Sequence, residues 1–424
     1  MTFPPAASLH EPTTSFYSRW QALNHWLAGH AEFWRPAPFM EPTPAWAQAR
    51  PELSAWLEGL SDEDCDYYEQ HLSEFARRIS GWLPGLADYE QRIAVPVLSP
   101  SPDTVDGTTL PEVAATDMPG RKRLQAGAFA ASVIPMNRPV LDWCCGKGHL
   151  SRTLARQCPE PVQGFEWDPA LVDDGNRLAR QFADDVTLHC QDVMAQDLSW
   201  PAGSHGVALH ACGDLHRQLI RRGSAAGAPR LSLSPCCYHL TAHSDYQLLS
   251  GQAKEHPRTL RLTRNDLRLA VQETVTAPAR VRAQTALVSQ WRLGFDALQR
   301  YLRDCGEYLP VPSHPTRLVN EGFEAFCRWA ARKKQLDLPE RVDWDQWLEV
   351  GQQRFRQVRR HELLRHLFRR PLELWLVLDY ATALEEQGYR VRLGTFCDRS
   401  LTPRNLLLDA VRACDTPPAP RNRP

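Results

Sequence analysis

The 424-residue sequence has almost no net charge, only 5 methionines and no long apolar segment. Its formal charge of −1 gives no overall attraction to nucleic acid. No run of about 18 uninterrupted apolar residues occurs, so we expect no membrane-spanning helix and no membrane partner. Lysines are few and arginine supplies most of the positive charge, a bias that does not by itself indicate RNA binding.

The first residues also lack the marks of a secretory signal peptide. Met1–Thr14 has neither a basic start nor an apolar run, so we expect a cytoplasmic protein. In that compartment the 12 cysteines are expected to be reduced thiols, without a disulfide-linked partner. The hydrophobic content of 43% is ordinary for a globular protein with a buried core.

What is present is a short motif near residue 145. An apolar stretch, 140–143, contains the acid Asp142 and is followed by Gly146 and Gly148, and a helical pattern begins directly afterwards. Glycine permits positive φ and a close approach of the backbone to a ligand. A helix start offers free N–H groups to the same ligand. An acid at a strand end suits a positively charged or hydroxyl-bearing group better than a phosphate.

Two other nucleotide motifs fit this segment less well. A dinucleotide-binding G-x-G-x-x-G motif requires a third glycine where the chain has Ser151. A P-loop requires Ser or Thr after its Gly-Lys pair, whereas Lys147 is followed by Gly148. A glycine turn without any ligand is the remaining alternative.

Four more expected strands follow, each separated from the next by enough residues for a helix, and they cover 162–166, 186–190, 206–210 and 231–234. This alternation predicts a parallel α/β sheet, whose ligands bind beyond the carboxyl ends of the strands. Glu166 follows the glycine turn by about 20 residues, the spacing of an acid that binds a ribose hydroxyl. Asp168, the competing acid, precedes a proline and is also suited to cap the next helix. Asp192 follows the third strand, where this fold places an acid near an adenine.

Three segments together resemble a known family: D-W-C-C-G-K-G-H-L-S from Asp142, H-A-C-G-D-L from His210 and S-P-C-C-Y-H from Ser234. They are similar to class I S-adenosylmethionine (SAM) methyltransferases, in the group of the human ribosomal RNA adenine dimethylase domain-like and glutathione S-transferase C-terminal-domain-containing proteins. More distantly they resemble the tRNA acceptor-stem 2′-O-methyltransferases. Cys144 stands where the family motif has its first glycine. The resemblance covers roughly residues 118–240 and 371–412.

The resemblance implies a Rossmann-like seven-stranded methyltransferase sheet, with an N-terminal helical domain and a helical insertion before the last two strands. It implies SAM as cofactor and a methyl transfer, which we interpret as acting on an oxygen or nitrogen of RNA. Methylation of a protein or small molecule, and SAM binding without catalysis, remain alternatives. The implied cofactor-binding residues are Asp142, Cys144, Gly146, Gly148, Glu166, Asp192, His210 and Cys212.

Methyl transfer from a sulfonium mainly requires the reacting atoms to be held in line. A general base is needed only when the acceptor carries a proton at neutral pH. His239 is the first candidate, because its ordinary pKa is near neutrality, and Asp214 is the second. The alternative for His239 is a structural imidazole bonded to a loop carbonyl.

The cysteines after the fourth and fifth strands, Cys212, Cys236 and Cys237, have three interpretations. In the first interpretation, one of the three cysteines acts as a nucleophile, as in RNA cytosine-5 methyltransferases. The Pro-Cys pair of this sequence, however, follows the fifth strand, whereas the corresponding motif of those enzymes follows the fourth. They could instead ligate zinc with His210 and His239, but no C-x-x-C spacing supports a closed site. We favour reduced cysteines that serve as small residues near the ligand, and no metal.

Composition and periodicity divide the chain into four predicted segments. Pro96–Glu112 is expected to be a linker, and Leu372–Leu378 is expected to be a strand or a buried helix. Long helices are expected at 15–31, 62–83, 279–301, 318–335 and 344–370. The segments are 1–112, an N-terminal helical domain; 113–240, the SAM-binding core; 241–370, a helical insertion; and 371–415, the C-terminal part of the core.

An arginine-rich helix in the insertion is the candidate RNA contact, because arginines with interleaved aromatics bind phosphates and stack on bases. The alternative is a solvated helix face whose leucines point to the core. Lys122 and Arg123, before the first strand, are further candidates for a phosphate or a cofactor carboxylate. The arginines proposed for RNA are Arg354, Arg356, Arg359 and Arg360.

Overall fold

The computed structural model describes residues 15–272 and 279–413. The chain forms two compact units. Among the described residues, the sheet unit comprises 15–27, 93–272 and 371–413, and the helical unit comprises 28–92 and 279–370. Each unit therefore draws on more than one of the four predicted segments. The segment Met1–Thr14, on which the signal-peptide prediction rests, lies outside the described residues. The last residues of the predicted segment 371–415 lie outside them as well.

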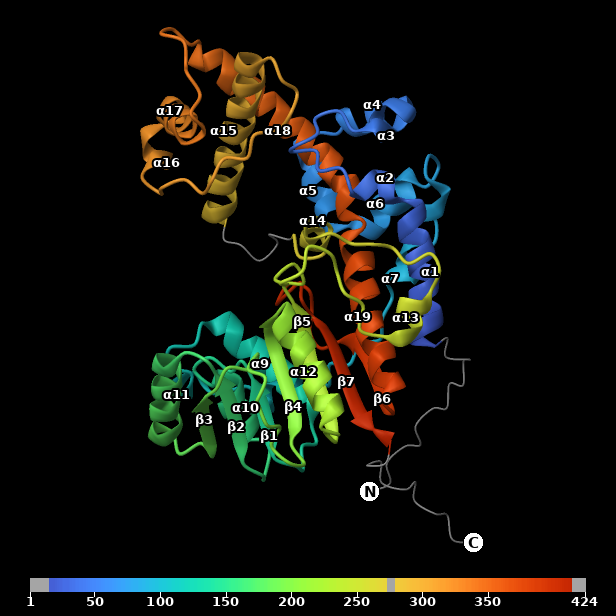
Figure 1. Ribbon diagram of the computed structural model, residues 1–424, viewed down its shortest axis with the longest axis vertical. Helices are drawn as coiled ribbons and strands as arrows, with labels where there is room; N and C mark the ends of the chain where they lie inside the picture. The colour runs from blue at the N-terminus through green and yellow to red at the C-terminus, as the bar shows by residue number, and fades with distance from the viewer. Residues whose placement is uncertain (1–14, 273–278, 414–424) are drawn as a thin grey trace. The chain divides into compact units, whose positions relative to one another are not determined.

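The sheet unit contains a seven-stranded sheet in the order β3-β2-β1-β4-β5-β7-β6. Strands β1 to β5 pair in parallel, and β7 is antiparallel to both of its neighbours. Figure 1 shows the red β7 and β6 of the C-terminal segment continuing the sheet beside β5. This α/β arrangement confirms the predicted Rossmann-like seven-stranded fold. The strands are β1 (Val140–Trp143), β2 (Val162–Glu166), β3 (Val186–Cys190), β4 (His205–Cys212), β5 (Arg230–Cys236), β6 (Tyr389–Thr395) and β7 (Leu406–Arg412).

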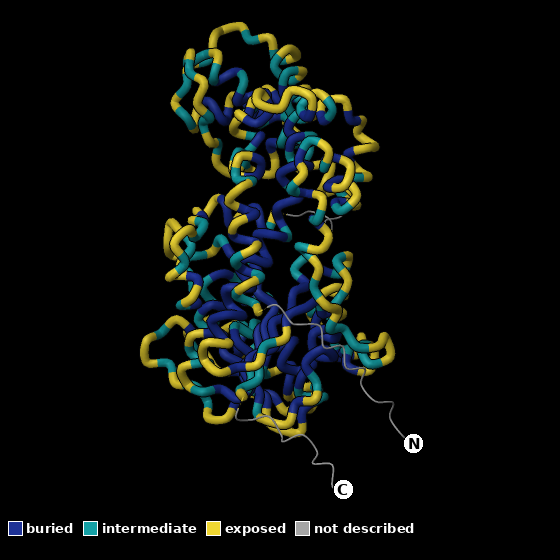
Figure 2. Tube along the Cα trace, turned by 90° about the vertical axis from the view of Figure 1, so that its right-hand side faces the viewer, coloured by how far each residue is buried: buried dark blue, intermediate teal, exposed yellow. Residues whose placement is uncertain are grey.

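The helices α10, α11 and α12 join β1 to β2, β2 to β3 and β4 to β5, because a parallel connection must cross over the sheet, whereas β3 is joined to β4 without a helix. The core beneath them contains Phe129, Leu154 and Leu407, each fully buried. Figure 2 shows the corresponding dark blue interior and the exposed yellow turns around it. The helices of this unit are α1 (Phe16–Gly29, whose last two residues fall in the helical unit), α8 (Pro102–Thr108), α9 (Gly120–Val133), α10 (His149–Ala155), α11 (Pro169–Gln181), α12 (Asp214–Ala225), α13 (Gly251–Glu255), α14 (Arg264–Leu269) and α19 (Arg369–Glu386, whose first two residues fall in the helical unit), with a 3-10 turn η2 (Glu112–Ala114).

One expectation for this unit is wrong, and for Leu372–Leu378 the buried-helix alternative is confirmed. Pro96–Glu112 is no simple linker, because it contains α8 and Thr108 donates a hydrogen bond through Oγ1 to the carbonyl of Gly127 (2.9 Å). Leu372–Leu378 is helical and lies inside α19. Its leucines and Trp375 are all buried, so the segment shows no amphipathic period that would identify it as a helix. The last two strands are therefore β6 and β7.

The helical unit is built around α15 and α18, with a core that includes Trp291, Phe295 and Phe326. The helix expected at 62–83 is interrupted at His71, and the one expected at 318–335 is interrupted at Gly322, where φ is +91°. In the described part of the chain, no helix combines the length and apolarity needed to cross a membrane. The elements are α2 (Ala31–Trp34), α3 (Ala45–Ala49), α4 (Pro51–Glu58), α5 (Asp62–Gln70), α6 (Leu72–Ile79), η1 (Pro84–Leu86), α7 (Tyr89–Ile93, whose last residue falls in the sheet unit), α15 (Ala279–Arg303), α16 (Leu318–Glu321), α17 (Phe323–Lys334) and α18 (Trp344–His366).

Candidate active site

Asp142, at the end of β1, is almost fully buried and is tied to the following helix. Ser151 of α10 donates a hydrogen bond through Oγ to its Oδ2 atom (2.6 Å). Burial raises the pKa of Asp142 to about 7, although the Ser151 hydrogen bond opposes the change. The carboxyl group is thus poised between its neutral and charged forms near neutral pH.

The loop after β1 turns through three left-handed residues, Cys144, Gly146 and Gly148, with φ values of +58°, +58° and +69°. A Cβ atom added at Gly146 would have no atom within 4 Å, so open space lies beside the loop. Gly148 is the N-cap of α10, where backbone N–H groups are free to face a ligand. The loop therefore has the open, glycine-dependent form that the motif predicts.

Glu166, at the end of β2, fastens this loop. Its Oε2 accepts a hydrogen bond from the backbone N–H of Gly146 (3.0 Å), and its Oε1 accepts from the N–H groups of Trp167 (3.0 Å) and Asp168 (3.1 Å). The side chain of Asp168 accepts from the N–H of Ala170 (2.9 Å) and caps α11. Of the two competing acids, Glu166 is the one that meets the glycine loop.

Beyond β3, the exposed Asp192 accepts a hydrogen bond at Oδ1 from the N–H of Met194 (2.8 Å). His210 lies within β4, and its Nε2 is 3.2 Å from Oε1 of Gln125 on α9. Burial lowers the pKa of His210 to about 4, so its imidazole is neutral at pH 7. The sequence did not reveal this contact between Gln125 and His210, because nothing in the pattern of α9 links it to β4.

A β-bulge brings the cysteines together. Leu209 pairs with Ser234, but Cys212 pairs with Cys236, so β4 contains one extra residue. His210 takes up the irregularity with φ of +64°. The Sγ atoms of Cys212 and Cys236 lie 3.6 Å apart, and with Cys237 all three Sγ atoms lie within 4.8 Å of one another.

The three thiols interact strongly. Hydrogen bonds from Cys212 and Cys236 lower the pKa of Cys237, and the charges of His239 and Arg404 act in the same direction. The same hydrogen bonds raise the pKa of Cys236. The electrostatics of the three thiols are thus coupled, and the shifts favour the thiolate form of Cys237 over that of Cys236.

The loops after β4 and β5 are bonded to each other. Gly213 donates from its N–H to the carbonyl of Cys236 (3.0 Å), and Asp214 donates likewise to Leu240 (2.9 Å). The Asp214 carboxylate accepts from the N–H of Ala242 (2.8 Å) and pairs with Arg217 (3.5 Å). These contacts hold the loop that carries His239, the first of the two predicted catalytic residues.

His239 is half-buried, and its Nδ1 atom is buried without a hydrogen-bond partner among the described residues. A structural imidazole would bond a loop carbonyl at this atom, and none of the described carbonyls does so. The catalytic role of His239 stays a prediction, because buried ring nitrogens without a partner among the described residues also occur at His149 and His361.

Replacing Gly213 with alanine is expected to lower the free energy of unfolding by about 3 kcal/mol, from steric overlap and backbone strain. Its φ is +57°, and an added Cβ would lie 1.9 Å from the carbonyl oxygen of Leu240. Gly203→Ala is the matched control, since Gly203 has a φ of +67° with nothing within 4 Å, and should cost only about 1 kcal/mol. Urea unfolding of both variants checks this, and equal losses would contradict it.

In the helical unit, three of the four arginines predicted to meet RNA have protein partners. Arg354 pairs with Asp296 (2.7 Å), and Arg360 donates through Nε to the carbonyl of Leu60 (2.8 Å). Arg359 lies among the acids of α5, namely Asp62 (3.7 Å), Glu69 (3.2 Å) and Asp66.

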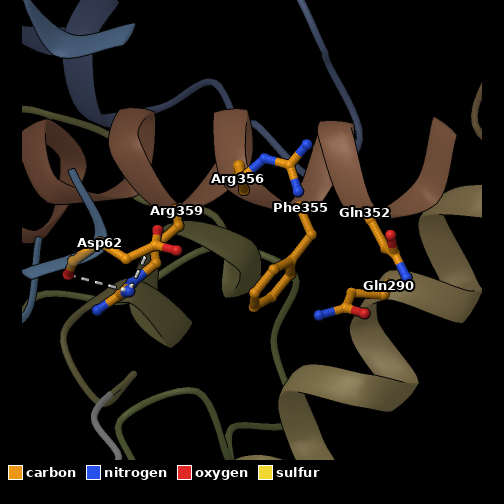
Figure 3. Close-up of a pocket in the computed structure, with 6 residues that line it drawn as sticks. All are labelled: Asp62, Gln290, Gln352, Phe355, Arg356 and Arg359. Carbon is orange, nitrogen blue, oxygen red and sulfur yellow. Dashed lines mark hydrogen bonds and ion pairs between the residues drawn. The ribbon is translucent and has the colours of Figure 1, made fainter. Parts of the chain in front are cut away.

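Arg356 differs, because it is exposed and its guanidinium has no ion pair among the described residues. With Phe355 it lines a cavity of about 240 Å³ between α18 and α15. Figure 3 shows both side chains on α18, with Gln290 of α15 opposite and dashed lines joining Asp62 to Arg359. Nucleic-acid contact through this helix stays a prediction, and Arg356 is the group best placed for it.

Residues 130–244 match a family model described as a methyltransferase domain, which covers about a quarter of the chain. No curated protein matches. The similar solved structures include a geranyl diphosphate methyltransferase in complex with GPP and sinefungin, at 19% identity over 26% of this chain and 44% of that chain, with a TM-score of 0.24. Another is the tRNA (uracil-54, C5)-methyltransferase of Pyrococcus abyssi with S-adenosyl-L-homocysteine, at 16% identity over 27% and 29%, with a TM-score of 0.22. A third is a putative RNA methyltransferase of Pyrococcus horikoshii, at 13% identity over 31% and 71%, with a TM-score of 0.24.

The chain thus spans less than half the length of the first two of these structures. The matched segment, residues 130–244, is similar to a methyltransferase domain, and SAM is the cofactor that the sequence resemblance implies. Its residues fit this cofactor, because open space at Gly146 adjoins the acid Glu166 at the carboxyl edge of the sheet. The narrower subgroup named by the resemblance stays a prediction.

Proposed function

We propose that the protein transfers a methyl group from SAM to an oxygen or nitrogen atom of RNA. One observation carries the proposal. Within the matched domain, the open glycine loop held by Glu166 and the half-buried His239 follow β1 and β5 at the same carboxyl edge of the sheet.

In this proposal, the acids Glu166 and Asp192 bind the nucleoside part of the cofactor, and the loop from Cys144 to Gly148 lets the backbone approach it. The cofactor supplies a methyl group on a sulfonium, which is already a good leaving group. His239 takes the proton of a hydroxyl or protonated nitrogen acceptor through its ring nitrogen. Asp214 acts through its bond to Ala242, by fixing the loop that positions His239.

Basic side chains near the site support an anionic acceptor. The exposed Lys122, near the start of α9, and Arg404, before β7, are close enough to His210 for their charges to lower its pKa further. In the helical unit, Arg356 beside Phe355 offers a charge and a ring of the kind that binds single-stranded RNA. Phosphates attract such residues regardless of base sequence.

The test is methyl transfer from labelled SAM to bulk RNA, cell-extract protein and small-molecule extract, each presented separately. We expect label in RNA, and we expect His239→Ala to reduce turnover by about 10²–10⁴-fold while SAM affinity is unchanged. His243→Ala, an exposed histidine on the same loop, is the control and should keep full activity. Label in protein or small molecules would replace RNA as the acceptor class. SAM binding without transfer to any of the three would leave a binding module.

If Arg356 contacts RNA, Arg356→Ala should weaken RNA binding several-fold and reduce the slope of log affinity against log salt by about 1. The control is Arg328→Ala on α17, whose guanidinium is also exposed but is paired with Glu324 (2.7 Å). Filter binding across a salt series measures both slopes. An Arg356→Ala slope equal to that of the wild type would remove this contact from the proposal.

A further inference from the structure

The three thiols at the ends of β4 and β5 have a geometry that suits a metal ion. Four sulfur ligands placed tetrahedrally around zinc at about 2.3 Å lie about 3.8 Å apart. The Sγ atoms of Cys212 and Cys236 are 3.6 Å apart, and Cys237 keeps all three within 4.8 Å. Small rotations of the side chains would therefore bring the trio to zinc-binding distances.

The backbone is shaped to bring these thiols together. Without the extra residue in β4, Ala211 would lie opposite Cys236, and Cys212 would not face it. The bulge at His210 and the residue Cys237 both adopt left-handed φ, at +64° and +48°. That conformation costs a non-glycine residue about 1–2 kcal/mol in free energy, and residues with such backbone strain are concentrated at functional sites. Small residues that only make room for a ligand would not require it.

The exposure of the three cysteines and the chemistry of their thiols also suit a bound ion. Cys212 and Cys237 are half-buried, so an ion can reach them, whereas Cys236 is buried. Soft thiolate ligands in tetrahedral array favour zinc over calcium or magnesium.

From these observations we propose that Cys212, Cys236 and Cys237 form a three-thiolate zinc site whose fourth coordination position is open. His239 does not belong to the group of mutually close metal-ligating atoms. The fourth coordination position of the zinc is therefore left to water or to a molecule that the protein binds. Three protein ligands with an open position are the arrangement of catalytic rather than structural zinc. The proposal does not depend on the identity of the methyl acceptor.

Metal content of the full chain, purified under reducing conditions, tests the site directly. Elemental analysis should find one zinc per chain. Cobalt added to the metal-free protein should give thiolate-to-cobalt charge-transfer absorption, and zinc should raise the thermal midpoint of unfolding. The exposed Cys190 provides the control, because Cys190→Ser should keep all three signals.

Cys212→Ser and Cys237→Ser should each lose stoichiometric zinc and the cobalt band, with circular dichroism confirming that they fold. These two positions are preferred because Cys236→Ser changes a buried residue and is more prone to misfold. A folded wild type without zinc, which gives no cobalt band on titration, would overturn the proposal. So would a Cys212→Ser/Cys237→Ser double variant that retains one zinc per chain.

Discussion

A Glu166→Gln variant is expected to bind SAM about 100-fold more weakly than the wild type. Glutamine has the same shape, but its amide offers one acceptor oxygen and an NH₂ group that is itself a donor. The carboxylate accepts from Gly146 on one oxygen and from Trp167 and Asp168 on the other. Either the N–H of Gly146 or the N–H groups of Trp167 and Asp168 must therefore face the NH₂ group of the glutamine. Loss of one charge-assisted hydrogen bond costs about 1.5–3 kcal/mol. If SAM binds only to the loop that Glu166 holds in place, this cost lowers the affinity, at about 1.4 kcal/mol for each factor of ten.

Calorimetric titration with SAM and with S-adenosylhomocysteine measures this loss. Glu160→Gln removes an exposed carboxylate a few residues upstream and should leave both affinities unchanged. Circular dichroism of the three proteins separates a binding defect from a folding defect. If well-folded Glu166→Gln bound SAM as tightly as the wild type, Glu166 would have no role in the site.

The position of Glu166 could be predicted from sequence because strands of a parallel sheet are short, apolar and separated by helices. The residue at which each strand ends can therefore be located in the sequence, and the carboxyl ends of parallel strands meet at one edge of the sheet. Asp142, Glu166 and Asp192 all follow this rule, and the structure places each at the carboxyl end of its strand. How Glu166 holds the loop could not be predicted, because its partners are backbone N–H groups and these carry no sequence signature.

The bulge in β4 and the partners of the arginines on α18 were beyond sequence reasoning for different reasons. A one-residue register shift at His210 changes no hydrophobic pattern, yet it decides which residue faces Cys236. Arg359 is neutralised by Asp66 and Glu69, which lie 293 and 290 residues away along the chain. A charge run alone cannot distinguish a solvated face from one that another helix covers.

The largest expected loss of stability is at Asp409 on β7. This carboxylate is 1% exposed and accepts from Arg230 at both oxygens (2.7 and 3.0 Å) and from Oγ of Ser232 (2.7 Å). It also pairs with Arg392 of β6. Asp409→Ala leaves two guanidinium groups without their carboxylate, which should cost about 3–5 kcal/mol in the free energy of unfolding. The control is Asp185→Ala, an exposed acid in the same unit, and urea unfolding compares them.

The same network makes stability depend on pH. Burial alone would raise the pKa of Asp409, but hydrogen bonds and charge from Arg230, with Ser232 and Arg392, outweigh it and lower the pKa to about 2. Burial lowers the pKa of His205, whose Nε2 is 2.8 Å from Ser232 Oγ, to about 3. Both groups accept protons in the unfolded chain before they do in the folded one. Stability is therefore complete above the unfolded pKa values and falls as the pH decreases toward the folded ones.

The two groups act in different pH windows, so they can be separated. His205 titrates near pH 6.5 when unfolded, and one pKa unit is worth about 1.4 kcal/mol, so it should remove about 2 kcal/mol between pH 6 and pH 4. Asp409 contributes mainly below pH 4. His205→Gln, which can still bond Ser232, should flatten the upper part of the profile, whereas Asp409→Asn should flatten only the lower part. An upper profile unchanged by His205→Gln would show that other groups cause the loss of stability above pH 4, and it would rule out His205 as the source of that loss.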